Sequence, residues 1–378
     1  MIKVIVSTRG TSSIPEFSGS TWVWLQYLLG LRKLGVECFW VDHLRSIDPL
    51  SHHHSLEYLV RRFDQTAQDF GFQDHYCIDY NRGEHYFGMQ KRQFVKLTQE
   101  ADLLVSVSGH LPPTSPLLNI PRRAYIDVDP GFVQIWAHEF DMGFDRHNFF
   151  FTVGQNVGTP EFTVPTRGID WHPIVPPVVL DQWPPHIDEK YQRISTIADW
   201  RGSQDAVFEG VYYGGKRDEF IRFLNVPLEV QPRIELALFI SQREYKDLGL
   251  LAQHKWHIED PVFWAGDPHS YREFIQFSRA EFSVAKHGYV QSNSGWISDR
   301  TVCYLASGKP ALVQSTGFEG RLPTGKGLLT FRTVEEAIAG IQAINHDYLA
   351  HCHAARQIAE AYCHSDTVLG SILEQVGL

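Results

Sequence analysis

The chain has 378 residues, 43% of them hydrophobic and 21% charged, a composition that suits a globular protein with room for two sizeable cores. Its formal net charge is −10 with neutral histidines, which argues against a general surface for binding nucleic acid. The five cysteines are scattered and include no Cys-x-x-Cys pair, so the sequence indicates a reducing compartment, the cytoplasm, rather than a disulfide scaffold.

The N-terminus and the apolar stretches give no sign of membrane insertion. The first residues are expected to form a strand, not the charged-then-apolar pattern of a signal peptide. The longest apolar stretch, residues 22–31, is too short to cross a bilayer. We therefore expect a soluble protein, while peripheral membrane contact and the oligomeric state stay open.

The first part of the chain predicts strands and helices in alternation. Residues 3–6 should form a buried strand, residues 7–20 a polar loop rich in Ser, Thr and Gly, and residues 21–34 an amphipathic helix. A second strand is expected over residues 36–41. This order is typical of a dinucleotide-binding half, but no Gly-x-Gly-x-x-Gly follows the first strand, which argues against a dinucleotide cofactor.

Two later strands are expected to end in polar residues. Residues 103–108 lead to His110, and residues 124–128 carry Asp127 and are followed by Asp129. Because ligands of an open α/β sheet bind beyond the carboxyl ends of its strands, these three residues are candidates for a general base that takes a proton from a substrate hydroxyl. We rank His110 first, since a histidine of ordinary pKa is neutral at cytosolic pH. The alternative is a loop histidine satisfied by the backbone.

A proline-rich segment separates the two halves of the chain. Residues 173–185 contain five prolines, and we expect residues 176–185 to form a semi-rigid linker. Beyond it the alternation resumes, with strands expected over residues 194–198, 236–240, 282–285 and 311–313. The sequence thus predicts two α/β domains, residues 1–175 and residues 186–350.

The stretch 278–318 combines a strand, a basic loop and a capped helix. Its strand is followed directly by Lys286, His287 and Gly288. Ser298 is an N-cap candidate with Asp299 in the first turn, and the helix should stop at Gly308. A helix N-terminus faced by a lysine on the preceding loop is an anion site by geometry.

The turn 306–310, Ala-Ser-Gly-Lys-Pro, resembles the Ala-x-Gly-x-Pro-Val turn in the donor segment of GT-B glycosyltransferases. The resemblance implies an α/β fold with two Rossmann-like domains facing a cleft, in which residues 351–378 form a helix that returns to the N-terminal domain. It further implies a metal-independent, hexosyltransferase-like enzyme without a bound cofactor. Its donor substrate would be a nucleotide diphosphate sugar, and its small-molecule acceptor is not indicated.

Candidate donor-binding residues follow from the same resemblance. The Ser/Gly-rich loop is similar to a GT-B loop that reaches toward the donor phosphates, and the segment before residue 218 is similar to a basic loop at the diphosphate, although its cations could equally sit on a solvated helix end. Together with the stretch 278–318, the candidates are Gly19, Ser20, Lys216, Arg217, Lys286, His287, Gly288, Ser298, Asp299 and Arg300.

One departure keeps two other functions open. Many retaining GT-B enzymes carry two glutamates where this chain has Gly295 and Cys303, and Asp299 is the nearest acidic residue. A nucleotide-sugar 2-epimerase on the same fold is one alternative, and it would need carboxylates around the donor sugar. A non-catalytic nucleotide-sugar-binding scaffold that has lost these acids is the other.

No metal site is expected. His52, His53 and His54 are adjacent, so they cannot all face one ion, and no spaced acid or cysteine accompanies them. Asp127 and Asp129 are similar to an Asp-x-Asp metal motif, but the surrounding strand order does not fit the fold that carries that motif.

Overall fold

The computed structural model describes residues 1–47, 54–202 and 205–378, and its N-terminal half is built on an eight-stranded sheet. The strand order is β4-β3-β2-β1-β5-β6-β7-β8, and all neighbours are parallel except the antiparallel pair of β3 and β4. The strands are β1 (Lys3–Thr8), β2 (Glu37–Leu44), β3 (Tyr76–Tyr80), β4 (His85–Gly88), β5 (Leu103–Val107), β6 (Arg122–Asp127), β7 (Phe149–Thr152) and β8 (His172–Pro173).

Helices cover both faces of this sheet because its strands are apolar on both sides. Along β1, Val4 and Val6 face the core that contains α1 and α2, whereas Ile5 faces the core that contains α3. This alternation is the two-residue period of a strand. The helices of this half are α1 (Ser18–Lys33), α2 (Leu56–Asp69), α3 (Lys91–Glu100) and the short α4 (Phe132–Trp136).

The C-terminal half is built on a six-stranded parallel sheet of order β13-β12-β9-β14-β15-β16. Counted along the chain this is the order 3-2-1-4-5-6 of a doubly wound sheet, and β3-β2-β1-β5-β6-β7 of the first sheet repeats it. The strands are β9 (Ile194–Asp199), β12 (Ile234–Phe239), β13 (His257–Glu259), β14 (Ala280–Ser283), β15 (Ala311–Gln314) and β16 (Leu328–Phe331).

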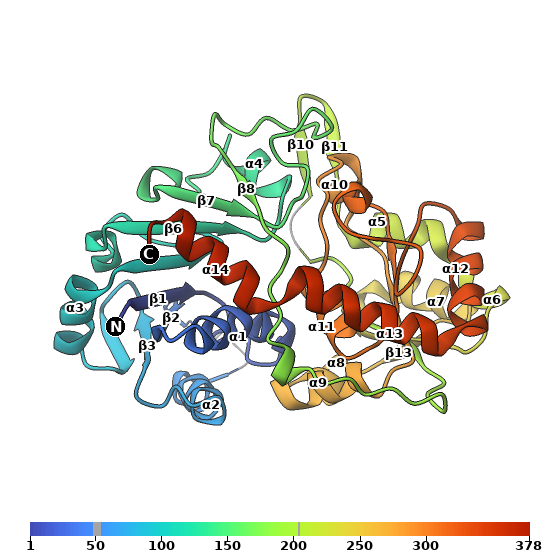
Figure 1. The fold of residues 1–378 in the computed structure, drawn as a ribbon, viewed down its shortest axis with the longest axis horizontal. Coiled ribbons are helices and arrows are strands. Elements are labelled where there is room, and N and C mark those ends of the chain that lie inside the picture. The colour runs from blue at the N-terminus through green and yellow to red at the C-terminus, as the bar shows by residue number, and fades with distance from the viewer. Residues whose placement is uncertain (48–53, 203–204) are drawn as a thin grey trace.

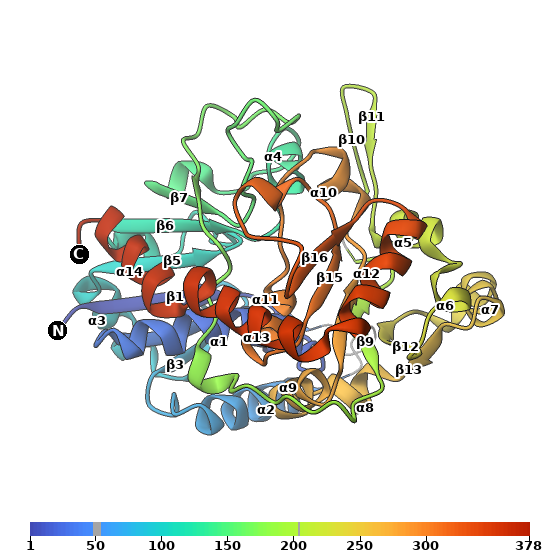
Figure 2. The same ribbon diagram turned by 45° about the vertical axis from the view of Figure 1, so that its right-hand side comes forward.

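The helices of the second half are α5 (Lys216–Phe220), α6 (Val226–Glu229), α7 (Tyr245–Gln253), α8 (Pro261–Ala265), α9 (Pro268–Gln276), α10 (His287–Gln291), α11 (Asp299–Ala306), α12 (Val334–His346) and α13 (Tyr348–Ile358). A separate hairpin of β10 (Ala206–Phe208) and β11 (Val211–Tyr213) projects beside α4 and α10 (Figure 1). The two sheets lie on opposite sides of the molecule, and the predicted fold class of two Rossmann-like domains is confirmed (Figures 1 and 2).

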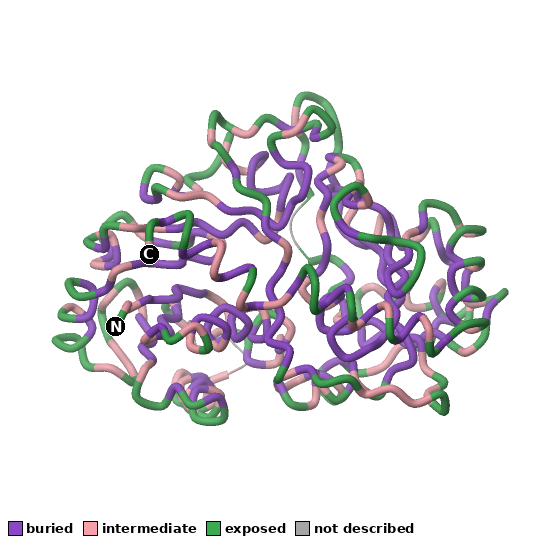
Figure 3. The backbone as a smooth tube through the Cα atoms, viewed as in Figure 1, coloured by how far each residue is buried: buried purple, intermediate pink, exposed green. Residues whose placement is uncertain are grey.

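The last helix, α14 (Ser365–Gln375), lies over the first sheet, although α13 belongs to the second (Figure 1). A π-helical turn, Ala359–Cys363, joins the two helices. α14 packs against α1 so closely that a Cβ on Gly30 would lie 2.5 Å from Cδ1 of Leu369. Buried segments lie in both halves of the molecule (Figure 3), and one hydrophobic core contains both Val4 of β1 and Leu328 of β16.

Most elements begin and end within a few residues of the sequence expectations, and three segments differ. Residues 351–378, expected as one helix, contain the end of α13, the π-helical turn and α14. Residues 76–88, where the sequence analysis places no strand, form the hairpin of β3 and β4. Residues 287–291, expected as a loop, form α10. No helix in the described ranges is both long and apolar enough to cross a bilayer.

Candidate functional site

A cavity of about 360 Å³ opens between the carboxyl ends of the second sheet and the N-terminus of α1. Asp199 and Phe239 reach it from the ends of β9 and β12, and Lys286 reaches it from the loop after β14. Ser18, Gly19 and Ser20 of α1 form the opposite wall. The cavity, called the donor cleft below, therefore lies where an open α/β sheet binds ligands.

Two helices point their N-termini at the donor cleft. α11 begins after Ser298, whose hydroxyl accepts a hydrogen bond from the Arg300 amide (3.2 Å), as expected from the sequence. The first turn of α1, with Ser18 and Gly19, has no side-chain cap and also lines the cavity. Both helix ends direct partial positive charge at the same space, which favours an anionic group there.

Three cationic side chains add to this field. Lys286 lies 2.6 Å from Asp129 Oδ1 of the first half, so its ammonium bridges the cleft. Lys216 is buried and donates to the Val284 carbonyl, and burial together with the charges of Arg300 and Lys286 lowers its pKa to about 7. Arg201 lies half exposed at the rim of the donor cleft, where its guanidinium donates hydrogen bonds of 2.9 and 3.1 Å to Glu244.

The first turn of α11 carries two charged residues, Asp299 and Arg300, which differ in their contacts. The guanidinium of Arg300 is taken up by Glu281 (2.7 Å), the Ile197 carbonyl (2.6 Å) and Ser283 (2.7 Å), so it supports the cleft wall. The Asp299 side chain makes no hydrogen bond to another described side chain and lines the cavity. Burial and the charge of Asp129 raise the pKa of Asp299 to about 7.

Seven of the ten predicted donor residues line the cleft, and three do not. Arg217 turns away to Asp247, which it binds through Nε (2.5 Å) and Nη2 (2.9 Å). His287 accepts from the Gly214 amide (3.1 Å) and stacks on the ring of Tyr212. At Gly288 a Cβ would lie 2.4 Å from the ring of Phe132, so this glycine allows α10 and α4 to approach. These three residues therefore shape the walls of the cleft and do not face its interior.

The two positions that lack glutamates have a local explanation. Gly295 has φ +69°, and a Cβ there would lie 2.8 Å from the Asn156 amide nitrogen. Cys303 is buried on α11, with its sulfur 3.6 Å from Nε2 of Gln26. Neither position can hold a solvated carboxylate without displacing a neighbour from the first half. Asp299, one turn before Cys303, is the acid that reaches the cavity.

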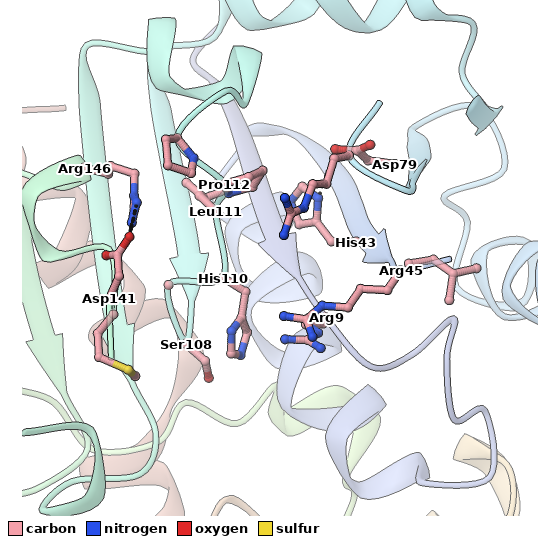
Figure 4. Close-up of a pocket in the computed structure, with 15 residues that line it drawn as sticks. Arg9, His43, Arg45, Asp79, Ser108, His110, Leu111, Pro112, Asp141 and Arg146 are labelled. Carbon is pink, nitrogen blue, oxygen red and sulfur yellow. Dashed lines mark hydrogen bonds and ion pairs between the residues drawn. The ribbon is translucent and has the colours of Figure 1, made fainter. Parts of the chain in front are cut away.

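A second cavity, of about 280 Å³, lies at the carboxyl end of the first sheet and is called the N-pocket below (Figure 4). His110 lies in its wall with an exposed side chain. The surrounding protein and the positive charges of Arg9 and Arg45 lower the pKa of His110 to about 4. His110 is therefore neutral at pH 7 and a weaker base than an ordinary histidine.

Asp127 and Asp129 do not share the position of His110. Asp127 is fully buried and accepts hydrogen bonds from Gln134 (3.0 Å), Thr152 (2.8 Å) and the Asp129 amide (2.9 Å). Burial nevertheless raises the pKa of Asp127 to about 7. It lines neither cavity and instead fixes the loop that presents Asp129 to Lys286.

Sequence reasoning missed the basic side chains on both sides of the site. Arg201 comes two residues after the end of β9, and Arg9 and Arg45 follow β1 and β2, so a search for cations directly after strands would have found them. No group of three or more His, Cys, Asp or Glu in the described ranges is arranged to hold a metal ion. His52 and His53 lie outside those ranges, and His54 Nε2 is 2.7 Å from Glu16.

Two doubly wound sheets with a ligand cleft between their carboxyl ends define the GT-B class of glycosyltransferase folds, and comparison with solved structures places the chain there. An α-glucosyltransferase in complex with UDP and a 13-mer DNA containing an HMU base is 13% identical, with a TM-score of 0.63 over 100% of both chains. Anabaena HepE in complex with UDP and glucose is 10% identical, with a TM-score of 0.57 over 100% of this chain and 99% of that one. AviGT4, a glycosyltransferase involved in avilamycin A biosynthesis, is 13% identical, with a TM-score of 0.52 over 100% and 97%.

No protein-family model matches the sequence, and a search of curated proteins finds no match. At such low identity the likeness to solved structures shows the fold alone. The function has to be argued from the site.

Proposed function

We propose that the protein is a glycosyltransferase that moves a sugar from a nucleotide diphosphate sugar to an acceptor hydroxyl. The observation that carries this proposal is the donor cleft, where the N-termini of α1 and α11 and the cations of Lys216, Lys286 and Arg201 converge on one cavity. When the bond between the anomeric carbon and the diphosphate breaks, negative charge grows on the leaving phosphate oxygen. Groups already directed at that oxygen stabilise the transition state. UDP or UDP-glucose, present in several of the similar structures, supports a uridine nucleotide as the first ligand to test.

The proposed reaction is hexosyl transfer without a metal ion, because these side chains and helix ends can neutralise the diphosphate. Asp299 is placed to bind hydroxyls of the donor from the first turn of α11. His110 is our candidate for the base that removes the acceptor proton if the reaction inverts configuration, whereas Asp129 forms an ion pair with Lys286. Loss of a positioned base typically costs about 10² to 10⁴ in rate, so His110→Ala should slow transfer while UDP affinity stays unchanged.

The alternatives on the same fold fit this site less well. A 2-epimerase needs several carboxylates around the donor sugar, whereas the described part of the cleft offers Asp299 and an Asp199 that is already bonded to the Arg201 and Gly202 amides. A scaffold that only binds the donor would not need the N-pocket with His110. The similar α-glucosyltransferase was solved in complex with DNA, but the net charge of −10 of this chain favours a small acceptor over nucleic acid.

We also propose the division of the chain into residues 1–175, a linker 176–185, residues 186–350 and a C-terminal segment 351–378, which is supported by the two sheets and by α14 on α1. We further propose a cytoplasmic location, because the five cysteines of the chain are free, buried thiols.

Calorimetric titration with UDP and UDP-glucose tests the proposed function directly. A ligand at about 100 times its dissociation constant stabilises the folded state by about 2.7 kcal/mol, so thermal unfolding gives an independent readout. If no nucleotide diphosphate binds, the proposal is wrong. If UDP-glucose binds and is converted to free UDP and an epimerised sugar without an acceptor, the epimerase replaces the transferase.

A further inference from the structure

The N-pocket is basic in an acidic protein. Its lining includes four arginines and two aspartates, a formal excess of two positive charges in a chain of net charge −10. Both aspartates already have partners in the pocket wall: Asp141 binds Arg146 (3.0 Å), and Asp79 binds His43 (3.2 Å). The positive charges that face the pocket are therefore not neutralised by the carboxylates that line it.

Two of these arginines are brought together by the sheet. Arg9 follows β1 and Arg45 follows β2, and the two strands are neighbours that pair Thr8 with Asp42 at their ends. In Figure 4 the side chains of Arg9 and Arg45 both extend toward His110. Burial lowers the pKa of Arg9, and repulsion from the like charge of Arg45 lowers it further.

The carboxylate of Asp42, at the end of β2, already accepts hydrogen bonds from the loop after β1. Asp42 is fully buried and accepts hydrogen bonds from Thr8 (2.6 Å) and from the Ser12 amide (3.0 Å). It therefore holds the loop after β1, which carries Arg9, and lies outside the pocket lining. Each guanidinium group presents a planar fork of donors that matches a phosphate or carboxylate.

We propose that Arg9 and Arg45 bind an oxyanion carried by the acceptor, so that the acceptor is a small molecule bearing a phosphate or carboxylate as well as the reacting hydroxyl. Arg82, which lines the same pocket, widens the cationic rim. The anion would fix the acceptor at one end and leave its hydroxyl near His110. A volume of about 280 Å³ suits a small molecule and not a polymer. This inference rests on the proposed function, because the pocket is taken to be the acceptor side of a transferase.

The test titrates the protein with methyl phosphate and, separately, with acetate, while saturating UDP fills the donor cleft. Binding is followed by the ring resonance of His110, assigned by its absence in His110→Gln. We expect at least one of the two anions to bind and to raise the pKa of His110, since the anion replaces repulsion from Arg9 and Arg45 by attraction. The anion that binds more tightly identifies the group on the acceptor.

Two variants and one control separate this site from general attraction by the surface. Arg9→Gln and Arg45→Gln should each weaken anion binding by about tenfold or more, the usual size of a lost charged hydrogen bond. Arg45 is exposed, so its variant should fold even if Arg9→Gln does not. Arg92→Gln removes an exposed arginine of α3, outside the pocket lining, and should change nothing.

The possible results bear differently on the two proposals. If UDP binds but neither anion does, the proposal of an anionic acceptor is wrong, while the proposed transferase function is not contradicted. The same holds if Arg9→Gln, Arg45→Gln and Arg92→Gln all bind the anions as tightly as the native protein does. If the anions bind through Arg9 and Arg45 but UDP does not bind, the pocket keeps its anion site and loses its place as an acceptor site. A short DNA duplex that binds through these arginines more tightly than either small anion would overturn the small-molecule acceptor.

Discussion

Lys286 binds Asp129 across the donor cleft in the structure, yet it also stands where a donor diphosphate would lie. The same carboxylate accepts a hydrogen bond from the Tyr289 hydroxyl, so Asp129 is held in place whether or not the lysine leaves it. A diphosphate and Asp129 would therefore compete for one ammonium group. The sequence placed Lys286 at the cleft, but the competitor comes from a loop 157 residues away in the chain.

The two variants of this pair should differ in their effect on UDP affinity, because only one of them removes the ammonium group. Lys286→Ala removes a charged contact worth about 1.5–3 kcal/mol and should weaken UDP binding by roughly ten- to a hundredfold. Asp129→Asn breaks the same ion pair but frees the lysine, so it should leave UDP affinity unchanged or increase it. Calorimetric titration measures both.

Arg217→Gln is the matched control, because Arg217 is a nearby cation that points to Asp247 and away from the cleft. It should lower stability without changing UDP affinity. An unchanged dissociation constant in folded Lys286→Ala would contradict the assignment.

Asp127 should make stability depend on pH in a way that one substitution removes. Burial raises its pKa to about 7 in the folded state, whereas an unfolded aspartate titrates near 3.9. Between these values the folded protein holds the proton more tightly, so the free energy of unfolding should fall as pH rises from about 4 to 7, by up to about 1.4 kcal/mol per pH unit. Below pH 4 both states are protonated and this dependence ends.

Urea unfolding at pH 5 and pH 7 tests this with Asp127→Asn, which keeps the shape of the side chain and cannot titrate. The fall in stability between the two pH values should be smaller in the variant than in the native protein, whatever its absolute stability. The same fall in both proteins would mean that Asp127 is ionised over the whole range.

At the scale of elements, the sequence was informative wherever a local pattern decided the structure. The N-cap at Ser298, the buried strands and the glycine end of α11 follow from hydrophobic runs and capping residues. The direction of a side chain follows from tertiary contacts that no local pattern contains. Arg217 and Lys216 are adjacent in sequence, yet one binds Asp247 and the other lines the cleft. The N-pocket likewise arises only when strands from separate parts of the chain are placed side by side.

Gly295 illustrates such a contact and yields a stability prediction. Its positive φ and the nearby Asn156 amide leave no room for a Cβ, so Gly295→Ala should destabilise the protein by about 1–3 kcal/mol. Gly370 lies within α14 with no atom within 4 Å of its Cβ position, so Gly370→Ala should stabilise slightly, by about 0.5–1 kcal/mol. Urea unfolding of the two variants should give opposite signs, and equal effects would show that Gly295 is not constrained.

At the scale of the whole molecule, the two sheets are joined through α1. Its Trp22 donates to the Pro268 carbonyl of the second half (2.7 Å), and its ring packs at a tilt of 59° against the ring of Trp183. Its Gln26 accepts a hydrogen bond from the Val179 amide (2.7 Å) in the proline-rich segment. α14 covers another side of the same helix. Because one apolar core runs through all of these elements, neither half can lose its structure without exposing the other.

This continuity predicts a single unfolding transition for the whole chain, and Leu369 of α14 tests it. Leu369 is 1% exposed, and Leu369→Ala should cost about 2–5 kcal/mol through lost burial and the cavity left behind. Differential scanning calorimetry should show one transition in both proteins, moved to a lower temperature in the variant. Leu349→Ala on α13 is the control, because that side chain is 44% exposed and its loss should change stability by no more than about 0.5 kcal/mol. If Leu369→Ala instead splits off an early transition that leaves the second sheet intact, then α14 stabilises the first half alone and the two halves unfold independently.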